Sequence, residues 1–298
     1  MSIRKIEYDK LVFYIIGYIL LGGFALVCLI PFYITIVNSF MDEGTIVREG
    51  YNIWISKFSL TGYGMVLKNP QAILQSYGIT AFVTVVGTAC SLLLVTMTGF
   101  ILSRRDFYYR NAMSFFFFFT TLFNGGLVPY YLLCTRTLHF TNKVYALIIP
   151  SLFSVWNMII AKNYFKSIPF EMIESAKIDG ANDFTVYFKI MLPISTPLLA
   201  TIGLFTALGY WNDWYNCMLF INNRHQELFT LQYYLQSMLN SAQALQQVAA
   251  KSGLSFNTVP LESMKMAMTV IATGPALIAY PFVQKYFVKG LTVGAVKG

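Results

Sequence analysis

Long stretches without a charged residue are the feature that most limits what this chain can fold into. Charged residues make up only 11% of the sequence and apolar residues 56%, whereas an ordinary soluble domain has about 25% charged residues. The charges are clustered, and several intervals between them reach the roughly 20 apolar residues that a helix needs to cross the hydrocarbon core of a membrane. We therefore interpret the chain as an integral membrane protein.

The apolar pattern predicts an all-α fold with six transmembrane helices. The first apolar stretch is too long for the apolar region of a signal peptide, and no A-x-A cleavage pattern follows it, so we count it as a retained span. Glycine and proline inside a span are tolerated because neighbouring helices can satisfy the freed backbone groups. The predicted spans are, to within a few residues, 11–38, 77–102, 112–134, 144–163, 194–218 and 264–284. We expect an N-terminal part, 1–75, with one span and an external loop, and a core, 76–298.

The distribution of Lys and Arg predicts the orientation of the chain, because basic residues favour the cytoplasmic loops of membrane proteins. With the N-terminus in the cytoplasm, the cytoplasmic segments hold twelve basic residues and the longer external segments hold seven. Both termini are therefore expected in the cytoplasm. The net charge of +8 does not indicate a nucleic-acid partner. The densest basic cluster lies between two apolar segments and consists of Arg104, Arg105 and Arg110. The cytoplasmic segments are 1–10, 103–111, 164–193 and 285–298, and the external ones are 39–76, 135–143 and 219–263.

No catalytic or metal-binding pattern is readable in the sequence. The four cysteines form no C-x-x-C pair and the two histidines are isolated, so we expect neither a zinc site nor a disulfide framework. The sequence has no G-x-x-x-x-G-K-[ST] loop and therefore cannot bind ATP through one. No set of nucleophile, base and orienting residue is readable either. We expect a chain that is not an enzyme and holds no cofactor.

The segment 167–193 lies between two predicted spans and is too polar to cross a membrane. Pro169 suits the first turn of a short helix, and Glu171 suits the positive end of its dipole. Gly180 is placed to end this helix in a left-handed turn. The pattern predicts a helix over 169–179.

A second short helix is predicted directly after that turn. Asn182 or Asp183 can cap it, and it is expected to run to Ile190, with Pro193 following before the next span. The product is a helix–turn–helix at the membrane surface. One stripe of the first helix consists of Ile173, Ala176 and Lys177.

The motifs of this segment resemble the EAA loop of ABC importer permeases. The family pattern is E-A-A, three residues, G, about nine residues, then I-x-L-P, and only the second residue of E-A-A differs here, where the small Ser175 replaces an alanine. The closing residues 286–298, YFVKGLTVGAVKG, resemble those of the maltose-type second permease of carbohydrate importers. The resemblance covers about 70–298. The residues that it assigns to the contact with the ATPase are Glu174, Ser175, Ala176, Asp179, Gly180, Ala181, Leu192 and Pro193.

The resemblance implies the type I ABC importer permease fold, with 167–193 as a coupling loop that docks on a cytoplasmic ATPase. It implies four kinds of partner in and around a bacterial cell membrane. They are a second homologous permease, two ATPase subunits that bind ATP and Mg, an extracellular solute-binding lipoprotein, and a sugar, expected to be an oligosaccharide. The alternatives are the same importer class carrying a peptide or another small polar solute, and a stand-alone secondary transporter. The latter would show an inverted repeat and paired intramembrane charges, and neither is readable.

The end of the fifth predicted span, GYWNDWYN at 209–216, is a candidate for the sugar path. It combines aromatic rings with amides and a carboxylate, which suits the C–H faces and hydroxyls of sugars. An aromatic belt at the outer membrane interface explains the same residues equally well. Two more asparagines are weaker candidates, for which helix packing is the alternative. The candidate residues are Tyr210, Trp211, Asn212, Asp213, Trp214, Asn157 and Asn124.

Overall fold

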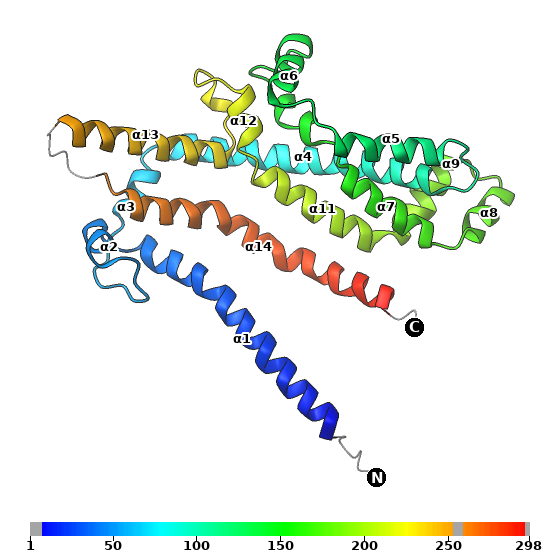
Figure 1. Ribbon diagram of the computed structural model, residues 1–298, viewed down its shortest axis with the longest axis horizontal. Coiled ribbons are helices and arrows are strands. Elements are labelled where there is room, and N and C mark those ends of the chain that lie inside the picture. Colours follow the sequence, from blue (N-terminus) through cyan, green and yellow to red (C-terminus); the bar gives the residue numbers. More distant parts are fainter. Residues whose placement is uncertain (1–7, 253–258, 296–298) are drawn as a thin grey trace. The chain divides into compact units, whose positions relative to one another are not determined.

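The computed structural model describes residues 8–252 and 259–295, and within these residues every regular element is a helix. This confirms the prediction of an all-α protein. The chain divides into two compact units, Met1–Lys68 with Met238–Gly274, and Asn69–Ser237 with Pro275–Gly298. Figure 1 labels the helices in chain order.

The first unit contains one long apolar helix, α1, and several short ones. The side chains of α1 are exposed over most of its length, as expected of a helix that meets lipid or another subunit instead of its own core. The carboxylate of Glu43 accepts hydrogen bonds from the backbone N–H groups of Glu262 and Ser263, both at 2.9 Å, and so caps the start of α14. The helices of this unit are α1, Tyr8–Ser39, α2, Glu43–Glu49, and α3, Thr61–Val66, with parts of α13, Leu231–Ser252, and α14, Leu261–Ala295.

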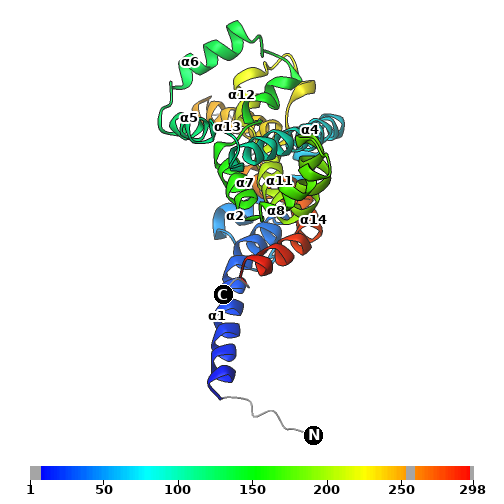
Figure 2. The ribbon, with the colours of Figure 1, turned by 90° about the vertical axis from the view of Figure 1, so that its right-hand side faces the viewer.

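The second unit is organised around α4. The side chain of Asn69 accepts a hydrogen bond from the N–H of Ala72 at 3.3 Å and caps this helix. α4 packs along α7 and α11, and both views show the three helices side by side (Figures 1 and 2). The helices of this unit begin with α4, Pro70–Ser103, α5, Arg110–Leu122, α6, Leu127–Leu132, η1, Leu133–Thr137, η2, Val144–Leu147, η3, Ile149–Ser151, and α7, Val155–Ser167. They continue with α8, Glu171–Ile178, α9, Asp183–Thr185, η4, Val186–Met191, α10, Leu192–Ile194, α11, Thr196–Trp211, α12, Tyr215–Phe220, and η5, Gln226–Leu228.

The contact between α4 and α11 depends on a glycine. A Cβ atom added to Gly87 would lie 2.5 Å from the ring of Tyr210, which is buried. A close approach of this kind is typical of helices that pack inside a membrane, where small residues let two backbones come together.

The membrane spans are less regular than the sequence predicts. Two of the described helices, Lys10–Ser39 and Pro70–Ser103, are long and apolar enough to cross a membrane, and up to five spans result if each of three bent helix pairs counts as one. The sixth predicted span, 264–284, falls within α14, which passes through Pro275 and Pro281 as one helix; the side chains of 279, 280 and 282–284 lie outside the described residues. The count of six spans stays a prediction.

Three predicted spans are bent or broken. The span predicted at 112–134 is interrupted at 123–126, and its two halves are bent by 112°. The second bend, of 51°, separates Val144–Ser151 from Val155–Ser167. The span predicted at 194–218 ends as a helix at Trp211, and α12 follows only at Tyr215. Each break holds only a few polar residues or glycines between apolar stretches, FNGG at 123–126, LFS at 152–154 and NDW at 212–214, so a span prediction from average composition ran across them.

Candidate functional site

The polar segment predicted as a helix–turn–helix folds as two short helices joined at a glycine. The first helix, α8, covers Glu171–Ile178, slightly less than the predicted 169–179. Gly180 has a φ of 81°, as its position predicted. The N–H of Gly180 donates to the carbonyl of Lys177 at 3.0 Å, and that of Ala181 donates to the carbonyl of Ala176 at 2.9 Å. These bonds satisfy two carbonyls at the end of α8.

The second helix starts where it was predicted to start but ends later. The side chain of Asn182 accepts a hydrogen bond from the N–H of Thr185 at 2.8 Å and is the cap. The predicted end at Ile190 is wrong, because the helix continues through a π turn, η4, to Ile194. Pro193 is compatible with this, since it lies in the first turn of α10. A bend of 83° then separates this segment from α11.

The inner face of α8 is packed against its own chain. Ile173 and Ala176 are buried in a core cluster with Tyr187 of η4 and Phe100 of α4. Burying a side chain such as Ile173 stabilises the fold by about 2 kcal/mol. Two residues of the predicted stripe, Ile173 and Ala176, therefore face inward, so Ala176 does not lie on the surface that a partner can reach. The third, Lys177, is exposed. Ala181 and Leu192 also pack against this cluster.

The outer face of α8 is exposed. It consists of Glu171, Glu174, Ser175 and Ile178, spaced at three, four and seven residues, so that they share one side of the helix. Ile178 is 86% exposed, the most exposed large apolar side chain on α8. Glu174 and Ser175 are among the residues predicted to contact the ATPase, whereas Ile178 was not predicted. Its position seven residues after Glu171 was the signal that could have identified it.

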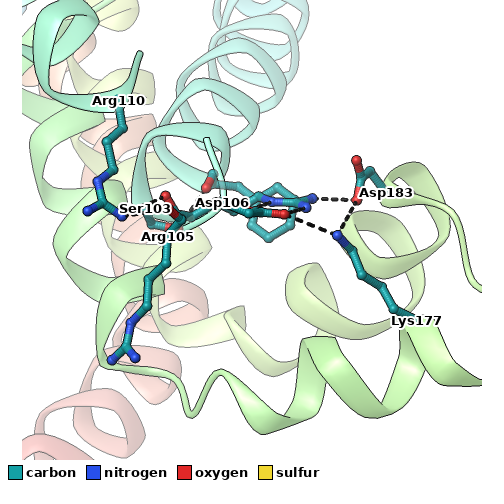
Figure 3. A network of polar contacts seen from close by, with 8 residues as sticks. Ser103, Arg105, Asp106, Arg110, Lys177 and Asp183 are labelled. Atoms are coloured by element: carbon teal, nitrogen blue, oxygen red, sulfur yellow. Dashed lines mark hydrogen bonds and ion pairs between the residues drawn. The ribbon is translucent and has the colours of Figure 1, made fainter. Parts of the chain in front are cut away.

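Four charged side chains join α8 to the end of α4, and we call them the charge ring (Figure 3). Arg104, which follows the last residue of α4, pairs with Asp106 and with Asp183. Lys177 of α8 lies 3.1 Å from a carboxylate oxygen of Asp106 and 3.8 Å from one of Asp183. Each cation thus contacts both anions. The side chain of Arg104 is only 9% exposed, whereas the other three are partly exposed.

The basic partners of Asp106 in the charge ring lower the pKa of its carboxyl. The hydrogen bond from Arg104 holds the pKa of its carboxyl well below the usual range, and the hydrogen bond from Lys177 acts in the same direction. Asp106 is therefore ionised at neutral pH, as the ring requires.

All three arginines of the basic cluster have local partners in this region. The guanidinium of Arg105 lies over the ring of Phe170, 5.9 Å from its centroid. Arg110 donates to the carbonyl of Arg105 at 2.9 Å and to that of Arg104 at 3.4 Å. Figure 3 shows Arg105 and Arg110 beside the charge ring. The sequence analysis assigned this cluster to orientation alone, because it could not show which groups the side chains contact.

A second candidate site is a cavity of about 520 Å³ in the second unit. Three of the predicted sugar-path residues, Asn157, Tyr210 and Asp213, line it together. The hydroxyl of Ser91, which is 1% exposed, also lines it and has no hydrogen-bond partner among the described residues. The Asn157 amide is nearly buried and makes one long bond, of 3.4 Å, to Thr206.

The acid in this cavity is already hydrogen-bonded. Asp213 accepts bonds from the N–H groups of Tyr215 and Asn216, at 2.9 and 3.1 Å, and from the side-chain amide of Asn216 at 2.6 Å. These donors satisfy much of the carboxylate, so it acts as an organiser of the turn after α11. The other lining residues carry hydroxyls, amides or aromatic rings, apart from Pro150 and Gly209.

The other predicted sugar-path residues do not join this cavity. Trp211 lines a separate, mostly apolar groove of about 670 Å³ along α4 and α11. Asn212 and Trp214 are exposed. Asn124 lies in the break between α5 and α6, where its side chain accepts a bond from the N–H of Gly126 at 2.9 Å. Ser91 and Thr206, which do line the cavity, were missed because each looks like an ordinary small residue of an apolar helix.

The chain has clear relatives among known proteins. The polygalacturonan/rhamnogalacturonan transport system permease protein YtcP of Bacillus subtilis is 38% identical over 291 residues, 98% of each chain. Protein LplC of the same organism is 37% identical over 289 residues, 96% of this chain and 95% of that one. The trehalose/maltose transport system permease protein MalG of Thermococcus litoralis is 28% identical over 299 residues, 98% of this chain and 99% of that one.

A solved structure agrees with these relatives. A chain of a bacterial ABC transporter involved in the import of the acidic polysaccharide alginate superposes with a TM-score of 0.76 at 29% identity, covering 96% of this chain and all of that one. The family model described as the inner membrane component of binding-protein-dependent transport systems matches residues 91–293, a range that includes both candidate sites. With more than half of its length matched and a relative of this identity along nearly all of it, the chain belongs to the family of binding-protein-dependent transport system inner membrane components, and it is a multi-pass membrane protein.

Proposed function

We propose that this chain is the permease subunit of an ATP-driven importer and forms part of the path of a sugar, an oligosaccharide, across the bacterial cell membrane. The observation that carries the proposal is the exposed outer face of α8. The chain belongs to a family of transport proteins, and its named relatives include permeases of carbohydrate transport systems. The alginate importer supports the same class of cargo.

The energy for transport comes from separate subunits in this proposal. The sequence holds no phosphate-binding loop, so ATP and Mg are bound by two ATPase subunits. A second homologous permease completes the path, and an extracellular solute-binding lipoprotein delivers the sugar. Both termini of this chain lie in the cytoplasm, which puts α8 on the side of the ATPases.

The ATPase binds the outer face of α8 in the manner of a helix in a groove. Ile178, with its apolar side chain almost fully exposed, fills an apolar pocket of the ATPase. Glu174 pairs with a basic group at the rim of the groove. Gly180 and Asp179 turn the chain directly after the contact, and Leu192 and Pro193 lead it back toward α11.

The sugar contacts the cavity lined by Ser91, Asn157 and Thr206. A buried hydroxyl without a partner and a nearly buried amide with a single long bond are groups that a sugar hydroxyl can satisfy. Tyr130 and Tyr215 add aromatic surface for the C–H faces of the sugar. Trp211 and Trp214 lie outside this cavity and are better explained as interfacial aromatics.

The test is transport by the complex assembled in proteoliposomes from this chain, its second permease, its ATPase and its binding protein. A panel of labelled oligogalacturonides, maltooligosaccharides and peptides is offered to the binding protein. We expect uptake of a carbohydrate that requires both ATP and the binding protein. Uptake of peptides with no uptake of any carbohydrate would favour the alternative cargo, and uptake without ATP would favour a secondary transporter.

A further inference from the structure

We propose that the charge ring of Arg104, Asp106, Lys177 and Asp183 is a positioning device that ties α8 to α4, so that a movement of α8 also moves α4. The inference rests on the proposed function, in which α8 is the contact with the ATPase. It adds residues that lie outside the coupling motif and gives the path by which a displacement of α8 reaches the cavity.

The geometry of the charge ring resists movement in more than one direction. Arg104 donates to Asp106 through Nε at 2.8 Å and through a terminal nitrogen, and it pairs with Asp183 through the other terminal nitrogen. A guanidinium that pairs with a carboxylate on each side fixes the orientation of the two carboxylates as well as their distance from it. Lys177 closes the ring from α8. Losing any one member breaks two of the four ion pairs.

Arg104 is the anchor of the ring because its side chain is nearly buried. A buried charge that loses its partners is costly, so Arg104 holds Asp106 and Asp183 in place. The backbone of Arg104 is fixed in turn, since its carbonyl and that of Arg105 accept bonds from Arg110. The ring is therefore attached to the rigid end of α4 and not to a free loop.

α8 needs such a tie because it is short. An isolated helix of eight residues is unstable, so its position depends on what it packs against. Its apolar contacts, through Ile173 and Ala176, hold one face. The charge ring adds a second attachment, through Lys177. Two attachments at different points resist rotation of α8 about either one.

A movement at the charge ring can reach the cavity because the same helix, α4, connects the two places. Arg104 directly follows α4 and Ser91 lies within it. At 1.5 Å per residue the two positions are about 20 Å apart along one continuous helix. A helix is stiff over that length, so a displacement at the charge ring is felt at the wall of the cavity.

The first experiment tests the tie without the ATPase. A nitroxide is attached at Ile178, which is 86% exposed, in the full-length chain in nanodiscs, and its mobility is measured by electron paramagnetic resonance. We expect higher mobility in Arg104→Gln and in Asp183→Asn than in the wild type. Arg104→Lys, which keeps the charge, should recover part of the order. The matched control is Lys166→Gln, because Lys166 is an exposed cation in the last turn of α7, outside the ring.

The second experiment measures coupling in the assembled complex. Arg104→Gln and Asp183→Asn should retain the ATPase and hydrolyse ATP, while the amount of sugar imported per ATP falls by at least about fivefold, the lower end of couplings between sites. Lys166→Gln should match the wild type. If Arg104→Gln does not fold, Asp183→Asn, at a partly exposed position, gives the answer.

The two experiments separate the proposals. A wild-type chain that fails to retain the ATPase contradicts the proposed function, whatever the nitroxide shows. Wild-type mobility at Ile178, or a wild-type ratio of sugar to ATP, in both Arg104→Gln and Asp183→Asn overturns the role of the charge ring and leaves the proposed function standing.

Discussion

The hydroxyl of Tyr187 lies 2.7 Å from the hydroxyl of Thr96, in a buried hydrogen bond between η4 and α4. The Thr96 hydroxyl donates its hydrogen to the carbonyl of Leu92, one turn earlier in α4. The bond between Tyr187 and Thr96 therefore links α4 to η4, which follows the turn at Gly180. It lies in the same core cluster as Ile173 and Ala176 and is independent of the charge ring.

Tyr187→Phe removes this hydrogen bond while keeping the ring. We expect a loss of about 1 kcal/mol in stability, the usual worth of a neutral hydrogen bond, and a lower melting temperature in detergent. Tyr164→Phe is the control, because the Tyr164 hydroxyl makes only a 3.5 Å contact with the carbonyl of Ile194. Equal melting temperatures for the two variants would show that the Tyr187 hydroxyl contributes nothing to the fold.

Gly87→Ala tests the close approach of α4 and α11. The added methyl group would meet the ring of Tyr210 at 2.5 Å, and both helices are packed there. Overpacking of this kind costs about 1–3 kcal/mol, so the melting temperature should fall. Gly78→Ala, on the same helix but with no atom within 4 Å of the new Cβ, should be neutral or slightly stabilising. A Gly87→Ala chain as stable as Gly78→Ala would contradict the helix packing.

The sequence predicted those features that depend on a few neighbouring residues. The left-handed Gly180 and the cap at Asn182 follow from local chemistry and are present. The direction in which Ala176 points could not be predicted, because it depends on Tyr187 and Phe100 packing above it. The pair of Arg104 and Asp183 joins residues 79 positions apart, so no local pattern announces it.

The candidate sugar site, too, could be predicted only in part from the sequence. The residues at 209–216 were recognised as a group, but only some of them line the cavity, namely Gly209, Tyr210, Asp213, Tyr215 and Asn216. Trp211 and Asp213 are two positions apart and face different cavities. Sequence reasoning could not separate them, since the helix was expected to continue to 218.

The lowered pKa of Asp106 predicts how the stability of the fold depends on pH. A carboxyl whose folded pKa is below its unfolded value of about 3.9 stabilises the fold above that unfolded value, and the contribution is lost as the pH falls through the folded pKa. Asp106→Asn should therefore melt at a lower temperature than the wild type at pH 7 and at pH 5. The difference should shrink only below about pH 4. A difference that disappears between pH 7 and 5 would mean that Asp106 is not paired.

Gly180→Val tests the turn of the coupling loop. An added side chain at Gly180 has open space around it, so the obstacle is the φ of 81° and not a clash. A β-branched residue resists that conformation by about 1–2 kcal/mol. The spans lie outside this turn, so the protein should reach normal levels in the membrane, while the ATPase is lost or hydrolyses ATP without sugar uptake. Gly180→Asn should retain more coupling, because Asn tolerates the left-handed region. Wild-type uptake by Gly180→Val at equal expression would remove the coupling assignment.

The sharpest test of the sugar site compares two hydroxyls on α4. Ser91 and Thr88 are three positions apart, and neither side-chain oxygen has a hydrogen-bond partner among the described residues, yet only Ser91 lines the cavity. If a sugar hydroxyl satisfies Ser91 during transport, Ser91→Ala removes one hydrogen bond, worth about 0.5–1.5 kcal/mol. The uptake rate at saturating binding protein should then fall by about two- to tenfold.

Thr88→Val should leave that rate unchanged, because Thr88 does not line this cavity. Melting temperatures should stay at the wild-type value or rise in both variants, since each removes a buried oxygen without a partner. Affinity of the binding protein for the sugar should be the same throughout, as it is a separate protein. Equal uptake by Ser91→Ala and Thr88→Val would move the sugar path away from this cavity, and a loss of uptake with a lowered melting temperature in Ser91→Ala would assign Ser91 to helix packing.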